Sequence, residues 1–299
     1  MLQNLGVKKL YIKLFDVDID KATQKALPLA KIQFTQAVNP SYEVVPTIYI
    51  TNKTLLQTPV EKIAELSKNI AHLIKSIGSN NKLTYKEIQF DCDWTDKTRL
   101  KYFTLLQDIR IYFPKATCLL SATIRLHQIK FFSKTGVPPI DRGMLMFYNM
   151  GKLSAQSSDN SIFNENDALK YSNWIDLYPL QLDVALPIFS WGIHSRNKHI
   201  VNLLNAVTKS EIEQKQQFKN CGNNCYKADS GFFYRGDYFM QNDILKIEEI
   251  TPDICKQASE LVADELPSTN RSVILYYIDS TNISRYEKTD FETIFTRFK

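Results

Sequence analysis

Two aspartates at the end of an apolar run are the residues in this chain best placed to do chemistry. If residues 87–95 form a strand, its period of two puts Asp91 and Asp93 on one face and apolar side chains on the other. Unpaired buried carboxylates are costly, so such a pair needs a partner, a proton or a solvated cleft. We therefore expect the pair to point at a ligand. The structural alternative is that one aspartate caps the following helix and the other pairs with an arginine.

Three further strand-like runs also end in charged or hydrogen-bonding residues, which are Asp16, Asp18, Arg125, His127, Gln128, Tyr148 and Asn149. The period of two points Arg125 and His127 into the same lumen as the aspartates. We interpret Arg125 either as a clamp on a substrate hydroxyl or carboxylate, or as a structural partner of Asp91. For His127, a hydrogen-bonded structural role is favoured over a role as a base.

Seven strand-like runs must position these residues, and they are residues 10–18, 44–51, 87–95, 118–128, 144–150, 180–188 and 272–279. Apolar residues recurring every three or four positions predict helices at 59–77 and 96–112, with Thr95 or Asp96 as N-cap of the second. Residues 231–240 are a weaker candidate for a strand or hairpin. Strands alternating with helices and no low-complexity linker predict one α/β domain over residues 1–299.

A TIM-type (β/α)8 barrel is the first candidate for this domain, and a doubly wound sheet is the second. Polar residues follow many strands, as the active face of a barrel requires, whereas a doubly wound sheet concentrates them at one switch point. We therefore favour the barrel.

Composition excludes several classes of function. The chain has 299 residues, 44% hydrophobic content and a net charge of +5 without a long basic block, so it does not resemble a nucleic-acid-binding protein. No apolar run is long enough to span a bilayer. The glycine-rich nucleotide, P-loop, serine-hydrolase and zincin motifs are absent. Only four histidines occur and none has ligand spacing, which disfavours a metal-dependent hydrolase. We expect a monomer without metal or cofactor.

Cys221 and Cys225 lie in a polar Cys-Gly-Asn-Asn-Cys loop. A tight loop disulfide is favoured here over two free thiols, and it would imply an oxidising compartment.

The 87–95 run resembles the fourth-strand signature of family-18 glycoside hydrolases, Asp-x-x-Asp-x-Asp-x-Glu. Asp91 and Asp93 match its last two aspartates, but Thr95 stands where the acidic Glu belongs and Ile88 occupies the first Asp position. Downstream, Met146-Phe-Tyr148-Asn149 resembles the Met-x-Tyr-Asp strand of that family. The run from Ala185 to Trp191 is similar to its Gly-x-Pro-x-Tyr-Gly strand.

A closer resemblance is to an uncharacterised bacterial family of barrels distantly related to those hydrolases. It rests on four motifs, at residues 10–18, 91–95, 121–128 and 136–143, and covers most of residues 8–200. Residues 209–267 match nothing familiar and are a possible insertion. In the hydrolases one more strand precedes the equivalent of residues 10–18, which predicts that this chain begins at the second barrel strand. If the start is truncated, the likeness implies a periplasmic or cell-envelope setting; otherwise the N-terminus, without a signal peptide, predicts a cytoplasmic one.

The family-18 resemblance implies roles for three residues. Asp93 would orient the acetamido group of the substrate, Asp91 would support it, and Tyr148 would hydrogen-bond the acetamide oxygen. The general acid does not carry over, because the Thr95 hydroxyl has no usable proton near neutral pH.

Three explanations for the missing acid stay open. Another carboxyl could supply the proton, with Asp16, Asp18, Asp141, Asp183 and Asp279 as candidates. Asp93 could itself be the acid if Asp91 raised its pKa. Otherwise the barrel has kept a sugar-binding cleft and lost hydrolysis.

Trp191 follows the strand at 180–188 and could be the floor on which a sugar ring stacks, or equally a lid on the core. Tyr277 and Asp279 fall on one face of the last predicted strand and could close the cleft. The leading prediction is thus a glycoside-hydrolase-like barrel that binds a carbohydrate at the C-terminal ends of its strands. The alternative is a non-catalytic glycan-binding or scaffolding barrel.

Overall fold

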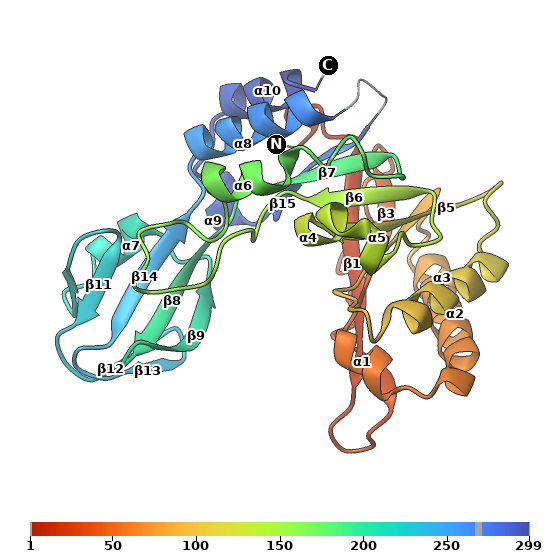
Figure 1. The fold of residues 1–299 in the computed structure, drawn as a ribbon, viewed down its shortest axis with the longest axis horizontal. Helices are drawn as coiled ribbons and strands as arrows, with labels where there is room; N and C mark the ends of the chain where they lie inside the picture. The colour runs from red at the N-terminus through yellow and green to blue at the C-terminus, as the bar shows by residue number, and fades with distance from the viewer. Residues whose placement is uncertain (1, 267–270, 299) are drawn as a thin grey trace. The chain divides into compact units, whose positions relative to one another are not determined.

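Strands that alternate with helices along the sequence assemble into one large sheet. A computed structural model describes residues 2–266 and 271–298. Its eight-stranded sheet has the order β15-β7-β6-β5-β4-β3-β1-β2, so seven of the strands are ordered as in the chain (Figure 1). The bounds are Lys9–Ile19 (β1), Ala26–Leu29 (β2), Glu43–Ile50 (β3), Glu87–Asp91 (β4), Leu119–Arg125 (β5), Arg142–Met146 (β6), Leu182–Pro187 (β7) and Val273–Tyr276 (β15).

The pairing of these strands is that of a mostly parallel sheet. β1 pairs in parallel with β3, β3 with β4, β4 with β5, and β15 with β7, whereas β2 folds back antiparallel to β1. The predicted α/β class of the barrel type is therefore confirmed. The prediction that the chain starts at the second barrel strand stays a prediction.

The chain divides into two units. Unit 1 comprises Met1–Leu145 and Leu177–Asp183, and unit 2 comprises Met146–Asp176 and Val184–Lys299. The boundary passes through strands β6 and β7, so the prediction of a single domain stays a prediction. Each unit is described below by itself.

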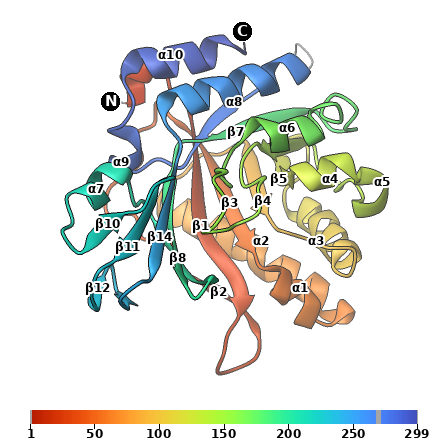
Figure 2. The same cartoon turned by 60° about the vertical axis from the view of Figure 1, so that its left-hand side comes forward.

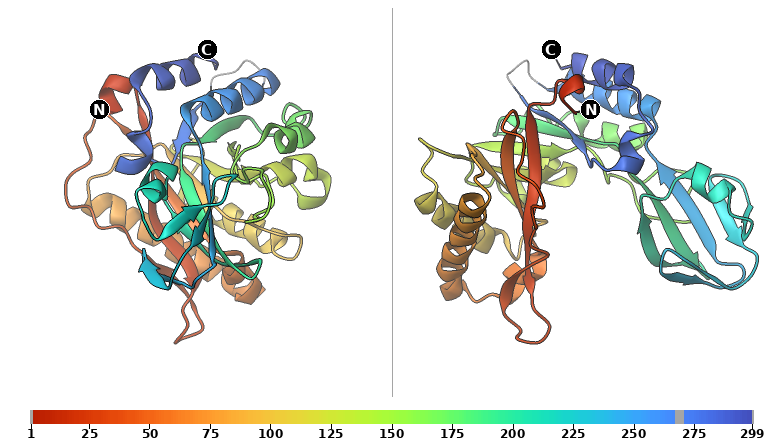
Figure 3. Two further views of the ribbon diagram at one scale, coloured as in Figure 1. Left: turned by 90° about the vertical axis from the view of Figure 1, so that its left-hand side faces the viewer. Right: turned by 180° about the vertical axis from the view of Figure 1, so that it is seen from behind.

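In unit 1 the outer face of the strands packs against helices. Period-two alternation buries Ile88 and Phe90 of β4, and α2 buries an apolar stripe that includes Ile70 and Ile74. The helices are α1 (Asn52–Gln57), α2 (Ile63–Asn80), α3 (Arg99–Tyr112), α4 (Leu126–Lys130) and α5 (Phe132–Thr135). Helices α2 and α3 lie side by side (Figure 3).

Unit 2 contains a second sheet, which is entirely antiparallel. Its order is β10 (Phe218–Asn220), β11 (Cys225–Ala228), β14 (Ile244–Glu249), β8 (Ser190–Arg196) and β9 (His199–Asn205). The remaining elements are a hairpin of β12 (Phe232–Tyr234) and β13 (Asp237–Phe239), and the helices α6 (Glu165–Ser172), α7 (Lys209–Glu213), α8 (Pro252–Glu265), α9 (Ser280–Ile283) and α10 (Lys288–Thr296). Helices α8 and α10 lie side by side (Figure 2).

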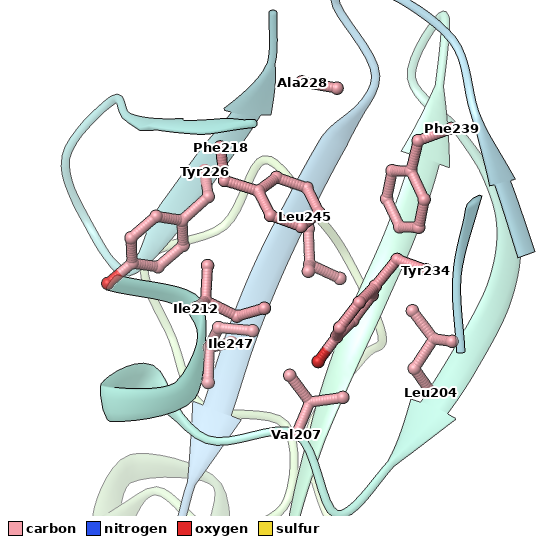
Figure 4. Close-up of a cluster of buried hydrophobic side chains, with 10 residues drawn as sticks. All are labelled: Leu204, Val207, Ile212, Phe218, Tyr226, Ala228, Tyr234, Phe239, Leu245 and Ile247. Carbon is pink, nitrogen blue, oxygen red and sulfur yellow. The ribbon is translucent and has the colours of Figure 1, made fainter. Parts of the chain in front are cut away.

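The second sheet has its own apolar core. Buried side chains from β9, β10, β11, β14 and the hairpin gather with Val207 and Ile212 into one cluster (Figure 4). Most of this core comes from the segment 209–267, and β8 and β9 belong to the same sheet. The prediction that this segment is an insertion stays a prediction. The hairpin alternative for residues 231–240 is confirmed.

Four predicted strands end at least three residues earlier than the sequence indicates. The run predicted at 87–95 is a strand only as far as Asp91, where β4 ends. β5 stops at Arg125 because the Gln128 side chain accepts from the Arg125 backbone N–H and starts helix α4. β6 stops at Met146 and β15 at Tyr276. The helix predicted from residue 96 begins at Arg99, after a turn in which the Thr95 carbonyl accepts from the backbone N–H groups of Thr98 and Arg99.

The structure also bears on the cysteine pair and on membrane-spanning helices. Cys221 and Cys225 are free thiols, so the expected loop disulfide is not present in this structure. Over the described residues, no helix combines the length and the apolar character that a bilayer crossing requires.

Candidate functional site

A row of polar side chains crosses four neighbouring strands of unit 1 near their C-terminal ends. Asp16 of β1 is aligned with Tyr49 of β3, and Tyr49 is aligned with Asp91 of β4. The Thr123 hydroxyl of β5 donates to Asp91 Oδ1 at 2.6 Å. A bulge after Lys13 shifts the register of β1, which turns Asp16 onto the same face as Lys13.

Two ion pairs flank this row. Arg125 Nη1 lies 2.9 Å from Asp93 Oδ2, and Lys13 Nζ lies 2.9 Å from Asp16 Oδ1. The Arg125 and Asp93 side chains keep 34% and 43% of their surface exposed, so both remain accessible to a ligand. We call this set the carboxylate cluster, and its members are Lys13, Asp16, Tyr49, Asp91, Asp93, Thr123 and Arg125.

The surroundings of the carboxylate cluster change the proton affinity of two members. Burial raises the pKa of Asp91 to about 6; the Thr123 hydrogen bond opposes the shift and the Asp93 charge adds to it. Burial, followed by the charges of Asp93 and Asp91, raises the pKa of the Tyr49 phenol to about 12. The cluster therefore offers a carboxyl that titrates near pH 6 beside a phenol that stays a hydrogen-bond donor.

The other unit 1 residues predicted for the site have different surroundings. Asp18 accepts from the Thr51 hydroxyl at 2.8 Å and from the Ile19 backbone, and these bonds lower its pKa. His127 lies on α4 and keeps solvent contact, while partial desolvation of its ring by neighbouring atoms, together with the Arg125 charge, lowers its pKa. Gln128 is fully buried as the partner of the α4 N-terminus. Because β5 ends at Arg125, the strand alternation that predicted a common direction for Arg125 and His127 does not apply.

Thr95, at the position of the family's general acid, lies in the turn before α3. Its hydroxyl is 3.3 Å from the Thr98 hydroxyl, and its backbone N–H donates to the same oxygen at 2.8 Å. The Thr98 hydroxyl in turn donates to Asn52 at 2.6 Å. Position 95 therefore supports a local turn and carries no acidic group.

A second group of ion pairs in unit 1 surrounds two buried carboxylates. Glu87, with a side chain 1% exposed, accepts from Lys9 at 3.1 Å and from Ser121 at 2.7 Å. Arg142 binds Asp183, whose side chain is also 1% exposed, through two bonds of 2.9 and 2.5 Å. We call Lys9, Glu87, Arg142 and Asp183 the buried ion network. Asp141, another candidate acid, forms ion pairs with Arg110 and Lys115.

Unit 2 contains an aromatic cluster that includes three predicted residues. Tyr148 stacks on Tyr276 with ring centroids 5.1 Å apart and planes 2° apart. Phe189 contacts Tyr148 and Trp191 edge-on, and it stacks on Tyr277 at 5.9 Å. Tyr276 remains 46% exposed. The structure thus brings Tyr148, Trp191 and Tyr277 together through Phe189, which the sequence did not single out.

The indole ring of Trp191 is hydrogen-bonded to a buried acid, Glu248. Its indole N–H donates to Glu248 at 2.8 Å, and the same carboxylate oxygen accepts from the Ser161 hydroxyl and backbone. Lys246 Nζ binds Glu248 Oε1 at 2.6 Å. A cavity of about 310 Å³ lies beside this ion pair, and its lining includes no predicted site residue.

Two other predicted residues of unit 2 lie outside the strands, one in a loop and one at the start of a helix. Asn149 is exposed in the loop after β6 in a left-handed conformation, with φ of 54°. Asp279 caps α9, where it accepts from the Asn282 backbone at 2.6 Å. Since β15 ends at Tyr276, Tyr277 and Asp279 do not share a strand face as the sequence predicted.

Sequence reasoning missed Lys13, Tyr49 and Thr123. The signal for Tyr49 was present, because alternation within residues 44–51 places it opposite the buried Ile48 and Ile50 near the strand end. Among the described residues, no three His, Cys, Asp or Glu side chains gather as a metal site would require.

Comparisons with known proteins give the fold a wider context. No protein-family model and no curated protein matches the chain. Among solved structures, the chain is similar to the Bacillus cereus spore cortex-lytic enzyme SleL, with a TM-score of 0.59 and 11% identity over 99% of this chain and 69% of that one. It is also similar to the chitinase-like agglutinin RobpsCRA of Robinia pseudoacacia, with a TM-score of 0.56 and 14% identity over 98% and 93%.

A chitinase from Chromobacterium violaceum is a third similar structure, with a TM-score of 0.55 and 8% identity over 99% of this chain and 94% of that one. At these identities the similarity shows the fold alone. The chain therefore shares the fold of chitinases and of a chitinase-like agglutinin.

Proposed function

We propose that the protein binds a carbohydrate through the carboxylate cluster of unit 1. The observation that carries the proposal is the row of Asp16, Tyr49, Asp91 and Thr123 across adjacent strands, with the accessible Asp93–Arg125 pair beside it. Polar groups gathered at the carboxyl ends of parallel strands are the usual site of ligands in barrels. The fold is shared with chitinases and an agglutinin, which favours a glycan as the ligand.

The residue types of the carboxylate cluster suit a sugar. Carboxylates accept hydrogen bonds from hydroxyl and amide groups, and Arg125 and Tyr49 can donate to hydroxyl or carbonyl oxygens. The resemblance to family-18 hydrolases assigns Asp93 to an acetamido group, so a glycan with N-acetyl groups is the ligand class we favour. The exposed Tyr276 of the unit 2 aromatic cluster is a separate surface suited to ring stacking.

We favour a protein that binds a glycan and does not hydrolyse it by the chitinase mechanism. A general acid contributes about 100- to 10,000-fold to the rate of such reactions, and Thr95 supplies none. Asp141 and Asp183 are in ion pairs with arginine, and Asp279 caps a helix. These contacts favour structural roles for the three.

One observation favours a second candidate, which is slow hydrolysis with Asp91 as the acid. Its pKa of about 6 keeps part of the carboxyl protonated in mildly acidic solution, as a general acid requires. Hydrolysis by this route would increase as the pH falls toward 5, and it would be lost in Asp91→Asn.

The test is a glycan array followed by calorimetric titration of each hit against wild type and Asp93→Asn. We expect Asp93→Asn to weaken binding by about tenfold or more, because a charged hydrogen-bond acceptor is lost. Asp253→Asn is the matched control, since its side chain is 95% exposed in unit 2. Equal binding by wild type and Asp93→Asn would remove the carboxylate cluster from the site, and product analysis would separate the binding protein from the hydrolase.

A further inference from the structure

The β12–β13 hairpin of unit 2 presents an aromatic pair on its outer face. Phe233 and Tyr238 are directly opposite each other in the pairing, with ring centroids 5.0 Å apart. Phe233 is 75% exposed and Tyr238 is 46% exposed. The outer face of a two-stranded hairpin is usually polar, because only its inner face is buried.

The inner face of the hairpin packs against the rest of unit 2. Phe239 and Tyr234 are buried in the apolar cluster of the second sheet (Figure 4). Phe232 packs against this cluster. The loop residues Arg235 and Gly236 have φ values of 49° and 87°, as a two-residue hairpin turn with a right-handed twist requires. A cross-strand aromatic pair adds to hairpin stability, but such a pair does not need this much exposure.

Hydrogen bonds also hold the hairpin rigidly. Arg196 donates to the Tyr238 carbonyl at 3.0 Å, and Asn202 donates to both carboxylate oxygens of Asp237 at 3.0 Å. Arg235 binds Glu211 at 2.8 Å. The aromatic pair is therefore fixed in position before any ligand arrives, which lowers the entropy lost on binding.

The Tyr238 ring lies close against the hairpin. A Cβ atom at Gly231 would be 2.5 Å from the Tyr238 hydroxyl oxygen, so the position of this ring depends on the absence of a side chain at residue 231. Because the φ of Gly231 is not positive, alanine is compatible with the backbone there.

We propose that Phe233 and Tyr238 form a second carbohydrate-binding surface, which stacks on a sugar ring of a polysaccharide. Two aromatic side chains offer a few hundred Å² at most, far below the roughly 800 Å² per partner of a stable protein interface, but enough for one ring. The pair itself is uncharged, which suits the apolar C–H face of a sugar. The choice of carbohydrate as the ligand rests on the proposed function.

The experiment measures retention on insoluble chitin and titration with a soluble pentamer of N-acetylglucosamine. The variants are Phe233→Thr, which keeps strand propensity, Tyr238→Ala and Gly231→Ala, which displaces one ring without removing it. The control is Phe131→Ala, an aromatic residue of unit 1 whose exposed fraction of 49% is close to the 46% of Tyr238. We expect the three hairpin variants to bind chitin about tenfold more weakly and Phe131→Ala to bind as wild type does.

The two proposals fail in different ways. If the hairpin variants retain chitin binding and only Asp93→Asn loses it, the hairpin surface is overturned and the proposed function stands. If only the hairpin variants lose binding, the hairpin surface stands and the carboxylate cluster is not the site. Equal loss in Phe131→Ala, or no binding by wild type to either probe, overturns the hairpin proposal.

Discussion

The carboxylate cluster and the buried ion network both lie in unit 1 and share strands β1 and β4, yet their charges are satisfied differently. Glu87 and Asp183 are almost fully buried, and each has a cationic side chain within 3.1 Å. Asp93 and Arg125 form one pair that stays more than one-third exposed on average, at the ends of β4 and β5. Buried charges without partners are strongly unfavourable, whereas exposed pairs contribute little to stability.

This difference separates structural from available acids. A buried carboxylate that is already bound by a cationic side chain cannot give up that partner to a ligand without a large loss of stability. A half-exposed carboxylate can exchange its arginine or water for a ligand at low cost. The exposed fraction of the side chain therefore distinguishes the acids that stabilise unit 1 from Asp93, which we propose binds a sugar.

The largest effect is expected in the buried ion network. Arg142→Ala removes the bidentate partner of the buried Asp183, and we expect the free energy of unfolding to fall by about 3–5 kcal/mol. Urea denaturation followed by circular dichroism measures this. A loss of unfolding free energy below about 1 kcal/mol would mean that solvent reaches Asp183. The buried ion network and the carboxylate cluster would then not differ in how their charges are satisfied.

An intermediate effect, which depends on pH, is expected at Asp91. A carboxyl with a raised folded-state pKa holds its proton more tightly in the folded protein, so its contribution to stability falls as the pH rises from about 4 to about 6. Asp91→Asn removes this loss and keeps an acceptor for Thr123. We expect the variant to exceed wild type by about 1–3 kcal/mol at pH 8 and to match it near pH 3.5.

Denaturation of both proteins across that pH range is the measurement, with Asp253→Asn as the control, since the Asp253 side chain is 95% exposed. A constant difference between wild type and Asp91→Asn at every pH would show that the Asp91 carboxyl titrates normally.

The smallest effect is expected at the rim of the carboxylate cluster. Arg125→Ala breaks a half-exposed pair, and the free energy of unfolding should change by less than about 1 kcal/mol. Glycan binding should weaken in the same variant. Destabilisation as large as that of Arg142→Ala would favour the alternative interpretation of Arg125 as a structural residue.

Local patterns predicted much of the framework. Period-two alternation correctly placed Ile88, Phe90, Cys92 and Trp94 in the core and left Asp91 and Asp93 on the other face. It failed at His127 and Gln128, because side-chain hydrogen bonding at Arg125 starts a helix there. The prediction that the last strand reaches Asp279 was also wrong, because β15 ends at Tyr276 and the Asp279 carboxylate caps α9.

The sequence by itself determined the alternation of strands and helices, the face on which each strand carries its polar residues, and the absence of a glutamate at position 95. Only the tertiary structure decided which of those polar residues are partners. Lys9 meets Glu87 across 78 positions, and Thr123 meets Asp91 across 32. The physical reason is that side-chain period is local to one strand, whereas the register between neighbouring strands is set by packing of distant segments.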